Sequence, residues 1–373
     1  MVGKINYQEM KIAGEAIPLI RVRLKKLLSR FSKRPRKEQD TILVVSNCII
    51  GDFLSYIPAI RELIKESKKR VDIIVSPPVK PIAERIRGIG KVWVAKSSYK
   101  RGIEGGHNSE QNLPREYGSL IILRISQESY TMIKRIIFSE IAVSDWIYLK
   151  YVLHLLRKTL LRKPIKQSRE LAFEMVGMKK DLEEIDKSMD IDDIFIFKKQ
   201  DSYFFKNIPD IKTKEKMILI HTGSGWQGRL WGNWRWAELL ERINKLGKFR
   251  FIFVGGTDQE KEAFNRIEGK VDFKIYSVIS KIDLKELFLL MKKSYYFIGV
   301  DSGPRNLAHL ANLRSISLRG PGTYFMPLNK KDIVIDRLNG LSASPFFSRK
   351  KHLVDNIEAK EVLNAFKKIL KEK

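Results

Sequence analysis

Short apolar runs alternate with longer amphipathic stretches from residue 41 onward. Thr41–Ser46 is apolar and β-branched at its centre, which is typical of a strand buried on both faces of a parallel sheet. A helix is predicted from about Phe53 to Ser67, and further strands are predicted over Val71–Val75, Lys91–Ala95 and Ser119–Ile125. This β-α alternation predicts a doubly wound α/β domain.

The same alternation restarts in the second half of the chain. Strands are predicted at Met217–His221, Phe251–Gly255, Tyr295–Val300 and Ser315–Leu318. Helices are predicted at Trp234–Leu246, Leu284–Lys292, Gly303–Ala311 and Ala359–Leu370. At about 150 residues per domain, we expect two consecutive α/β domains, formed by residues 41–200 and 201–355. Residues 1–40 are then a basic extension, and residues 356–373 a C-terminal helix that can pack back on the first domain.

The charge balance is unusual for a globular protein. The 373 residues include 71 Lys and Arg against 43 Asp and Glu, a net charge of +28. This surplus implies a polyanionic partner, either nucleic acid, an anionic membrane or a phosphorylated substrate. Two stretches without any acid, residues 21–37 and 150–169, hold nine and seven of the basic residues.

The first basic stretch has the pattern of an amphipathic helix. Ile20, Leu24, Leu27, Leu28 and Phe31 lie on one helical face, and such a basic helix is typical of a membrane interface. A solvated helix packed on the protein body is the alternative.

Other features favour the cytosolic side. No apolar run approaches the ~18 residues of a membrane span, and the first residues lack a signal-peptide pattern. A single cysteine, Cys48, excludes a disulfide framework. We therefore expect a cytoplasmic protein, peripheral on the inner face of the cytoplasmic membrane.

The turns after the strands carry the candidate chemistry, because ligands bind beyond the carboxyl ends of strands in open α/β sheets. Gly51 and Asp52 follow the first strand. The position of Asp52 allows two interpretations, an N-cap of the next helix or a general base at the binding edge.

Three turns of the second domain offer ligand contacts. The stretch His221–Arg229 (HTGSGWQGR) has the composition of a phosphate cradle, with a merely flexible loop as the alternative. Arg229-Leu230 stands where a P-loop needs Lys and Ser or Thr, which argues against magnesium-dependent NTP hydrolysis. Gly255 to Glu260 either places a carboxylate near a ribose or starts a capped helix. Asp301-Ser302-Gly303-Pro304 is either a plain cap or a diphosphate site.

Together, these features resemble the ADP-heptose:lipopolysaccharide heptosyltransferase family, which are inverting glycosyltransferases of the GT-B fold. The resemblance covers roughly residues 41 to 371. The features that carry it are Gly51-Asp52 with Pro58-Ala59, the block His221–Leu239, the Val254-Gly255-Gly256 turn, and Asp301-Ser302-Gly303-Pro304 with Leu307-Ala308. It implies a GT-B architecture, in which two Rossmann-like domains face a central cleft.

The resemblance also implies residue roles. Asp52 would be the catalytic base that deprotonates the acceptor hydroxyl, and Gly51 and Arg61 would contact the acceptor. The donor-binding residues would be Thr222, Gly223, Ser224, Arg229, Gly255, Gln259, Glu260, Asp301, Ser302, Gly303 and Pro304. The family's reaction needs no metal and no cofactor beyond a nucleotide sugar, here ADP-linked. The acceptor would be an anionic glycolipid or glycan such as lipopolysaccharide, and no nucleic acid is expected to bind.

The chain departs from the family pattern at several positions. Arg229 replaces the usual Lys, Thr222 the usual Pro, and Arg305-Asn306 the usual Met-His. The last change is expected close to the donor sugar, so a UDP-hexose or another nucleotide sugar is an alternative to ADP-heptose. A non-catalytic nucleotide- or glycan-binding protein and a nucleic-acid-binding protein are the rivals from other classes.

The histidines allow a further expectation. His221 is expected to be a structural or ligand-orienting residue, and His309 a packed one.

Overall fold

The computed structural model describes residues 40–95, 113–124, 127–133, 135–143, 191–208, 214–225, 227–320, 331–337 and 354–371. The two basic stretches, 21–37 and 150–169, and the membrane contact predicted for them lie outside these residues. The chain divides into two compact units and passes into the second for the last time between Ile196 and Phe197.

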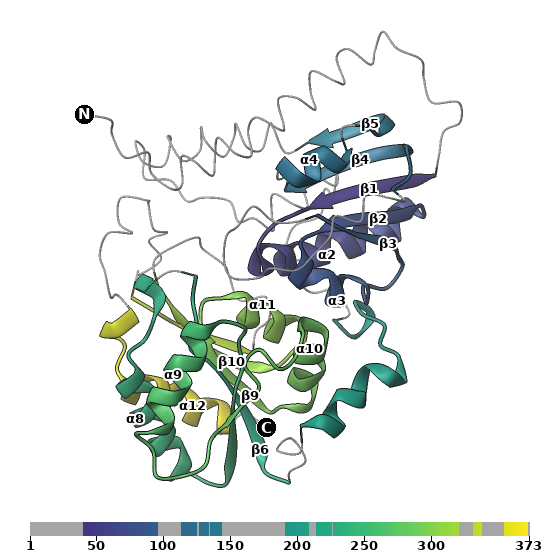
Figure 1. The fold of residues 1–373 in the computed structure, drawn as a ribbon. Helices are drawn as coiled ribbons and strands as arrows, with labels where there is room; N and C mark the ends of the chain where they lie inside the picture. Colours follow the sequence, from purple (N-terminus) through teal and green to yellow (C-terminus); the bar gives the residue numbers. More distant parts are fainter. Residues whose placement is uncertain are drawn as a thin grey trace, which may run out of the picture. The chain divides into compact units, whose positions relative to one another are not determined.

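The first unit is built on a parallel sheet of five strands. They are β1 (Thr41–Ser46), β2 (Arg70–Val75), β3 (Ile89–Val94), β4 (Glu116–Arg124) and β5 (Ile137–Val143). Their order in the sheet is β3-β2-β1-β4-β5 (Figure 1). The connecting helices are α2 (Ile50–Ser67), η1 (Pro77–Val79), α3 (Lys80–Ala83) and α4 (Gln127–Ile133). β1 is at the centre of the sheet, which explains why its sequence is apolar on both faces.

The second unit repeats this plan with six parallel strands. They are β6 (Lys216–His221), β7 (Phe249–Phe253), β8 (Tyr276–Ser277), β9 (Tyr296–Val300), β10 (Arg314–Arg319) and β11 (Asp332–Asp336), in the order β11-β10-β9-β6-β7-β8. The helices are α8 (Asn233–Asn244), α9 (Asp258–Glu268), α10 (Leu284–Lys293), α11 (Gly303–Leu310) and α12 (Ala359–Lys371). Its 3-10 helices are η4 (Lys199–Asn207), η6 (Gln227–Arg229) and η8 (Val354–Asn356), whereas η3 (Ile191–Asp193) lies at the boundary between the two units. Both sheets therefore have the doubly wound order predicted from the sequence.

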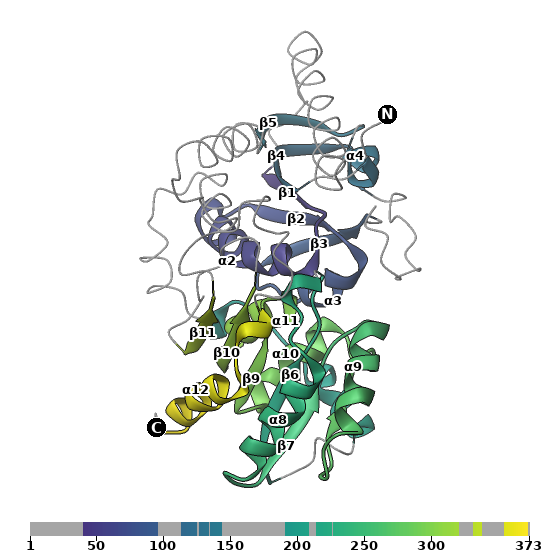
Figure 2. The ribbon, with the colours of Figure 1, turned by 90° about the vertical axis from the view of Figure 1, so that its left-hand side faces the viewer.

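Helices cover both faces of the second sheet. α8, α9 and α12 lie on one face and α10 and α11 on the other (Figure 1). Trp236 of α8 and Phe366 of α12 are fully buried in the core that α8, α9 and α12 form with the strands. The C-terminal helix lies with the elements of the second unit (Figure 2). Its apolar face is buried in the core of that unit, whereas the sequence suggested packing on the first domain.

Most predicted elements are present, and the differences have physical reasons. α2 begins at Ile50, three residues before the predicted start, and Pro58 lies inside the helix. β8 is only two residues long, and β11 begins and ends with Asp, so neither has the apolar run that predicts a strand. Within the described ranges, no helix combines the length and apolar character needed to cross a bilayer.

Candidate functional site

Each sheet has one topological switch point. A switch point is a pair of neighbouring strands from which the chain continues in opposite directions along the sheet. This pair is β1 and β4 in the first unit, and β6 and β9 in the second. Ligands of open α/β sheets bind beyond the carboxyl ends of the strands at this point. Asp52 follows β1 and Asp301 follows β9, so the predicted site residues flank both switch points.

Asp52 lies in the first turn of α2, but it is not the N-cap. The N-cap position is Ile49, which makes no side-chain cap, and Asp52 is the third residue of the helix. Its Oδ2 atom is 3.7 Å from Nη2 of Arg124, the last residue of β4, and its side chain is 15% exposed. The interpretation of Asp52 as a simple N-cap is therefore wrong. An accessible carboxylate at the switch point can accept a proton from a bound hydroxyl.

Arg124 also interacts with Tyr56, one turn further along α2. Burial raises the pKa of Tyr56 well above its usual range, although the charge and hydrogen bond of Arg124 oppose this shift. Arg124 therefore contacts both the buried phenol and the accessible carboxylate.

Arg61 has a local partner instead of facing this edge. Its Nη2 atom donates to Asp193 Oδ2 at 2.7 Å, and its Nε atom donates to the Asp193 carbonyl at 3.2 Å. Arg87 also contacts the Asp193 carboxylate. Arg61 thus anchors η3 on α2, and its predicted contact with an acceptor stays a prediction.

Glu260 is held in the α9 N-terminus of the second unit. It forms a capping box with Thr257, and its Oε2 atom accepts hydrogen bonds from the backbone of Gly256 and Thr257. A Cβ atom at Gly223 or Gly255 would overlap the Glu260 carboxylate, so both positions require glycine. Of the two interpretations of this turn, the capped helix start is the one observed. The ribose contact stays a prediction for Glu260 and for the neighbouring Gln259.

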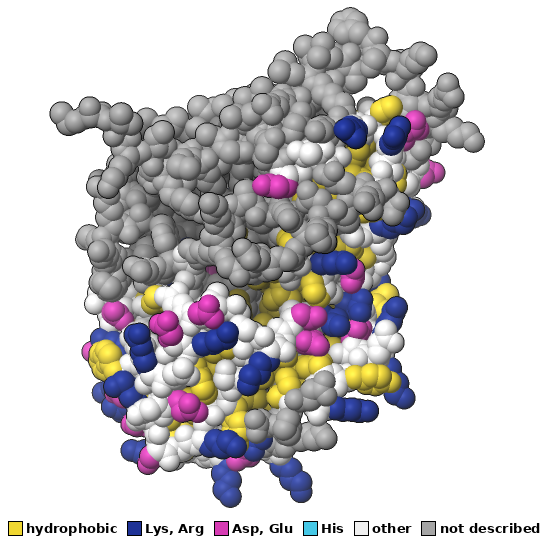
Figure 3. All heavy atoms as spheres, viewed as in Figure 1, with side chains coloured by type: hydrophobic (Ala, Val, Ile, Leu, Met, Phe, Trp, Pro, Cys, Tyr) yellow, Lys and Arg dark blue, Asp and Glu magenta, His cyan; other side chains and the backbone are white. Residues whose placement is uncertain are grey.

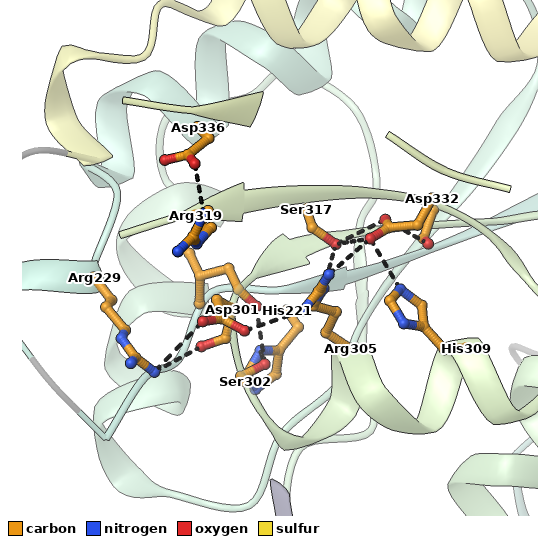
Figure 4. A network of polar contacts seen from close by, with 12 residues as sticks. His221, Arg229, Asp301, Ser302, Arg305, His309, Ser317, Arg319, Asp332 and Asp336 are labelled. Carbon is orange, nitrogen blue, oxygen red and sulfur yellow. Dashed lines mark hydrogen bonds and ion pairs between the residues drawn. The ribbon is translucent and has the colours of Figure 1, made fainter. Parts of the chain in front are cut away.

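His221 joins Glu260 to the turn after β9. Its Nε2 atom is 2.8 Å from Glu260 Oε1. Its Nδ1 atom is 3.0 Å from Ser302 Oγ (Figure 4). Burial alone would raise the pKa of Glu260, but the hydrogen bond and charge of His221 and the N–H of Gly256 lower it to about 2. The carboxylate is therefore ionised throughout the physiological range.

Ser302 occupies the N-cap position of α11, but its hydroxyl does not cap the helix. The Oγ atom donates to the Val300 carbonyl at 3.0 Å and contacts His221 instead. Pro304, in the first turn, has no N–H group, so the N–H groups of Gly303 and Arg305 remain at this helix end. The plain-cap interpretation of this motif is wrong, and such an end favours anions.

Behind this turn lies a buried network of charges (Figure 4). Arg305 donates to Asp301 Oδ1 at 3.3 Å, to Asp332 Oδ2 at 3.0 Å and to Ser317 Oγ at 2.9 Å. His309 Nε2 lies 3.0 Å from Asp332 Oδ2. Burial raises the pKa of Asp332, but the donors His309 and Arg305 outweigh it, and the pKa lies well below its usual range. Arg305 thus points into the protein and fixes Asp301, whereas the sequence placed it close to the donor sugar.

Arg229 approaches Asp301 from the other side. Its Nη1 atom is 3.7 Å from Asp301 Oδ2 and 3.5 Å from the Asp301 carbonyl oxygen. Asp301 Oδ2 is buried and has no hydrogen-bond donor among the described residues. Thr222 is buried at the end of β6, and Ser224 is half-buried in the following turn. The structure thus brings most of the predicted donor residues to one sheet edge.

A family model for glycosyltransferase family 9 (heptosyltransferase) matches residues 142–354, more than half of the chain. The chain belongs to glycosyltransferase family 9. It is therefore a glycosyltransferase. A curated relative, lipopolysaccharide heptosyltransferase 1 of Campylobacter coli, is 27% identical over 160 residues. That match covers 42% of this chain and spans about half, 47%, of the relative.

Solved structures agree with this glycosyltransferase in fold. A family 9 glycosyl transferase from Veillonella parvula has a TM-score of 0.65 at 16% identity, covering 89% of this chain and 97% of that one. The E. coli ADP-heptose heptosyltransferase II has a TM-score of 0.64 at 15% identity, covering 89% and 99%. An E. coli heptosyltransferase with ADP-2-deoxy-2-fluoro heptose has a TM-score of 0.59 at 14% identity, covering 88% and 99%. The predicted GT-B fold of two Rossmann-like domains is confirmed.

Sequence reasoning missed several polar residues of this glycosyltransferase. Arg124 ends an apolar strand and Asp332 begins a short one, and neither lies in a glycine turn. Arg124 could have been found from its place at the carboxyl end of β4, next to β1, and Asp332 from its pairing with Ser315 of β10. Both neighbours are known only when the strand order is known. Within the described ranges, no group of three or more His, Cys, Asp or Glu is arranged to hold a metal ion.

Proposed function

We propose that this glycosyltransferase moves heptose from ADP-heptose to a lipopolysaccharide acceptor with inversion at the anomeric carbon. The observation that carries the proposal is the uncapped α11 N-terminus, which lies at a switch point beside Arg229 and the turn after β6. Two positive features at a sheet edge suit the diphosphate of a nucleotide sugar. The curated relative and two of the structural neighbours are heptosyltransferases, which supports heptose as the sugar.

In the proposed reaction, Asp52 takes the proton of the acceptor hydroxyl. The acceptor oxygen then attacks the anomeric carbon from the face opposite the diphosphate, and the bond from this carbon to the diphosphate oxygen breaks. Negative charge grows on the departing ADP, and Arg229 with the N–H groups of α11 stabilises it. Asp301 and Ser302 bind the donor beside that charge.

The acceptor and its location form the second part of the proposal. We propose that the basic stretches 21–37 and 150–169 hold an anionic glycolipid at the inner face of the cytoplasmic membrane. On the face of the second unit seen in Figure 3, Lys and Arg are interspersed with Asp and Glu. A mixed surface of this kind does not favour nucleic acid as the partner.

A ligand panel followed by a transfer assay tests this function. ADP, UDP, GDP, CMP and their sugar conjugates are compared by thermal shift, with a short DNA as control. A ligand at about 100 times its Kd adds about 2.7 kcal/mol of stability, and we expect this effect for ADP and ADP-heptose. Transfer to a heptose-free lipopolysaccharide core, with the anomeric configuration of the product read by NMR, tests inversion.

Each alternative outcome has a clear meaning. Selective stabilisation by UDP would replace the donor and retain the fold and Asp52 as base. Stabilisation by DNA alone would contradict the enzymatic function. Deletion of residues 1–37 is expected to reduce binding to anionic vesicles, and unchanged binding would contradict the membrane contact.

A further inference from the structure

Asp301 lies between two arginines from different elements (Figure 4). Arg305, which follows it by four residues and belongs to α11, donates from Nη1 to Asp301 Oδ1 at 3.3 Å. Arg229, the last residue of η6, has its Nη1 atom 3.7 Å from Asp301 Oδ2. This second distance is too long for a hydrogen bond, and Oδ2 accepts none from the described residues. Asp301 is therefore paired closely with Arg305 and only loosely with Arg229.

The two arginines differ in their surroundings. The side chain of Arg305 is 2% exposed, and it also donates to Asp332 Oδ2 at 3.0 Å and to Ser317 Oγ at 2.9 Å. A guanidinium held by three acceptors in the protein interior cannot turn toward a ligand. The side chain of Arg229 is 16% exposed and can be reached from solvent. Of these two cations, Arg229 is the one that can contact the donor.

The carboxylate of Asp301 competes with a ligand for Arg229. Because Asp301 is buried, loss of Arg305 would leave its charge without a close partner, which is strongly unfavourable. Arg229 would have to approach Oδ2 by only about 1 Å to form a charge-assisted hydrogen bond of ordinary length. Its guanidinium would then bind Asp301 instead of a phosphate.

We propose that Arg305 is a positioning residue of the donor site, which pairs with Asp301 and so prevents this carboxylate from drawing Arg229 away from the diphosphate. The inference rests on the proposed function, in which Arg229 binds the departing diphosphate. Arg305 itself does not touch the donor. It acts through the balance of charge around Asp301.

The packing of the neighbouring residues keeps Arg229 within reach of Asp301. A Cβ atom at Gly320 would lie 2.9 Å from Arg229 Cγ and 3.1 Å from its Cα atom, so Arg229 packs directly on the glycine at the end of β10. The preceding residue, Arg319, has a carboxylate of its own, since its Nη1 atom is 2.6 Å from Asp336 Oδ2. Arg229 is therefore the cation that Asp301 would take if Arg305 were absent.

Two carboxylates share Arg305, and they provide a matched pair of backgrounds. Arg305→Gln removes the charge and keeps an amide that can donate a hydrogen bond. Combined with Asp332→Asn, it leaves Asp301, which lies beside Arg229. Combined with Asp301→Asn, it leaves Asp332, whose ion pairs are with Arg305 and His309. Both double variants lose one buried cation and one buried carboxylate, so they differ only in which carboxylate remains.

The test measures the Kd of ADP by calorimetry, on the full chain and on variants that circular dichroism shows to be folded. We expect Arg305→Gln to weaken ADP binding about 10- to 100-fold, the value of one charge-assisted hydrogen bond, in the wild type and in Asp332→Asn. In Asp301→Asn, the same substitution should change the Kd by less than about 2-fold, because no carboxylate is left to take Arg229. In Arg229→Gln, it should also have no further effect.

A role in folding alone would give a different pattern. Arg305→Gln would then change the Kd equally in the Asp301→Asn and Asp332→Asn backgrounds, and this result would overturn the inference. The comparison does not depend on the single variant, because the buried charge is balanced in both double variants. If Arg305→Gln does not fold alone, the two double variants decide between the two roles.

The two proposals fail in different ways. A wild type that binds no ADP would contradict the proposed donor. Equal Kd values of ADP for the wild type and Arg305→Gln would contradict the role of Arg305 and leave the donor as proposed.

Discussion

The two sheets present equivalent edges, yet the edges are built differently. After β1, Asp52 forms one ion pair within the part of the chain that the structure describes, with Arg124 at 3.7 Å, and the two side chains are 15% and 25% exposed. After β6 and β9, Asp301, Arg305 and Asp332 form continuous ion pairs whose side chains are at most 5% exposed. The same topology thus carries an open carboxylate in one unit and a fixed network in the other.

The difference matches the two tasks proposed for these edges. A general base must reach a hydroxyl and receive its proton, which an accessible side chain with few partners can do. A site that stabilises growing negative charge works best when its donors are already in place. Substitutions at the first edge should therefore change the rate, and substitutions at the second edge should change stability and donor binding.

Asp52→Asn should give the largest effect on the reaction. Loss of a general base costs about 10²- to 10⁴-fold in rate, while an accessible side chain with one distant ion pair contributes little to folding. We expect kcat for transfer to fall by this factor and the free energy of unfolding to change by less than about 0.5 kcal/mol. Asp40→Asn, an exposed carboxylate before the opposite end of β1, is the control and should leave the rate unchanged. A near-wild-type rate in Asp52→Asn would contradict the assignment of the base.

Arg305→Met should give the largest effect on stability. It leaves the buried carboxylates of Asp301 and Asp332 without their shared cation, and breaking a buried pair typically costs about 3–5 kcal/mol. The control is Arg242→Met, which removes an exposed ion pair with Glu238 at the same helical spacing of four residues and should cost under about 1 kcal/mol. Urea unfolding measures both variants. If both variants lost the same free energy of unfolding, the buried ion pairs of Arg305 would contribute no more to stability than an exposed pair.

Glu260→Gln should change how stability depends on pH. The pKa of Glu260 falls from 4.5 to about 2 on folding, so the ionised carboxylate stabilises the protein above pH 4.5. This contribution, about 3 kcal/mol at most, is lost as the pH falls toward 2. The unfolding free energy of the variant should therefore fall less steeply than that of the wild type between pH 4.5 and 2.5. Glu286→Gln, which removes the carboxylate of the same capping box at the N-terminus of α10, should follow the wild type, and a slope equal to that of Glu260→Gln would attribute the effect to helix capping.

The contrast between the edges could be predicted only in part from the sequence. The apolar strands, the glycine turns and the order of the motifs placed Asp52 and Asp301 at sheet edges, because local pattern and spacing carry that information. The partners of these residues could not be predicted. Arg305 was expected near the donor sugar, but a helical residue four positions after Asp301 can turn inward where β11 supplies Asp332. That pairing depends on strand order, which is a property of the whole sheet.

Arg124→Met should have the smallest effect and tests whether the first edge is truly open. The charged pair with Asp52 is partly exposed and 3.7 Å long, which is worth under about 1 kcal/mol. Arg124 also interacts with the buried Tyr56, and loss of such a hydrogen bond adds about 1 kcal/mol. We therefore expect a total loss of about 1–2 kcal/mol in urea unfolding. Tyr56→Phe in the Arg124→Met background should recover the part due to the phenol, since it removes the unpaired hydroxyl. A loss as large as that of Arg305→Met would mean that Asp52 also belongs to a fixed network, and the distinction between the two edges would fail.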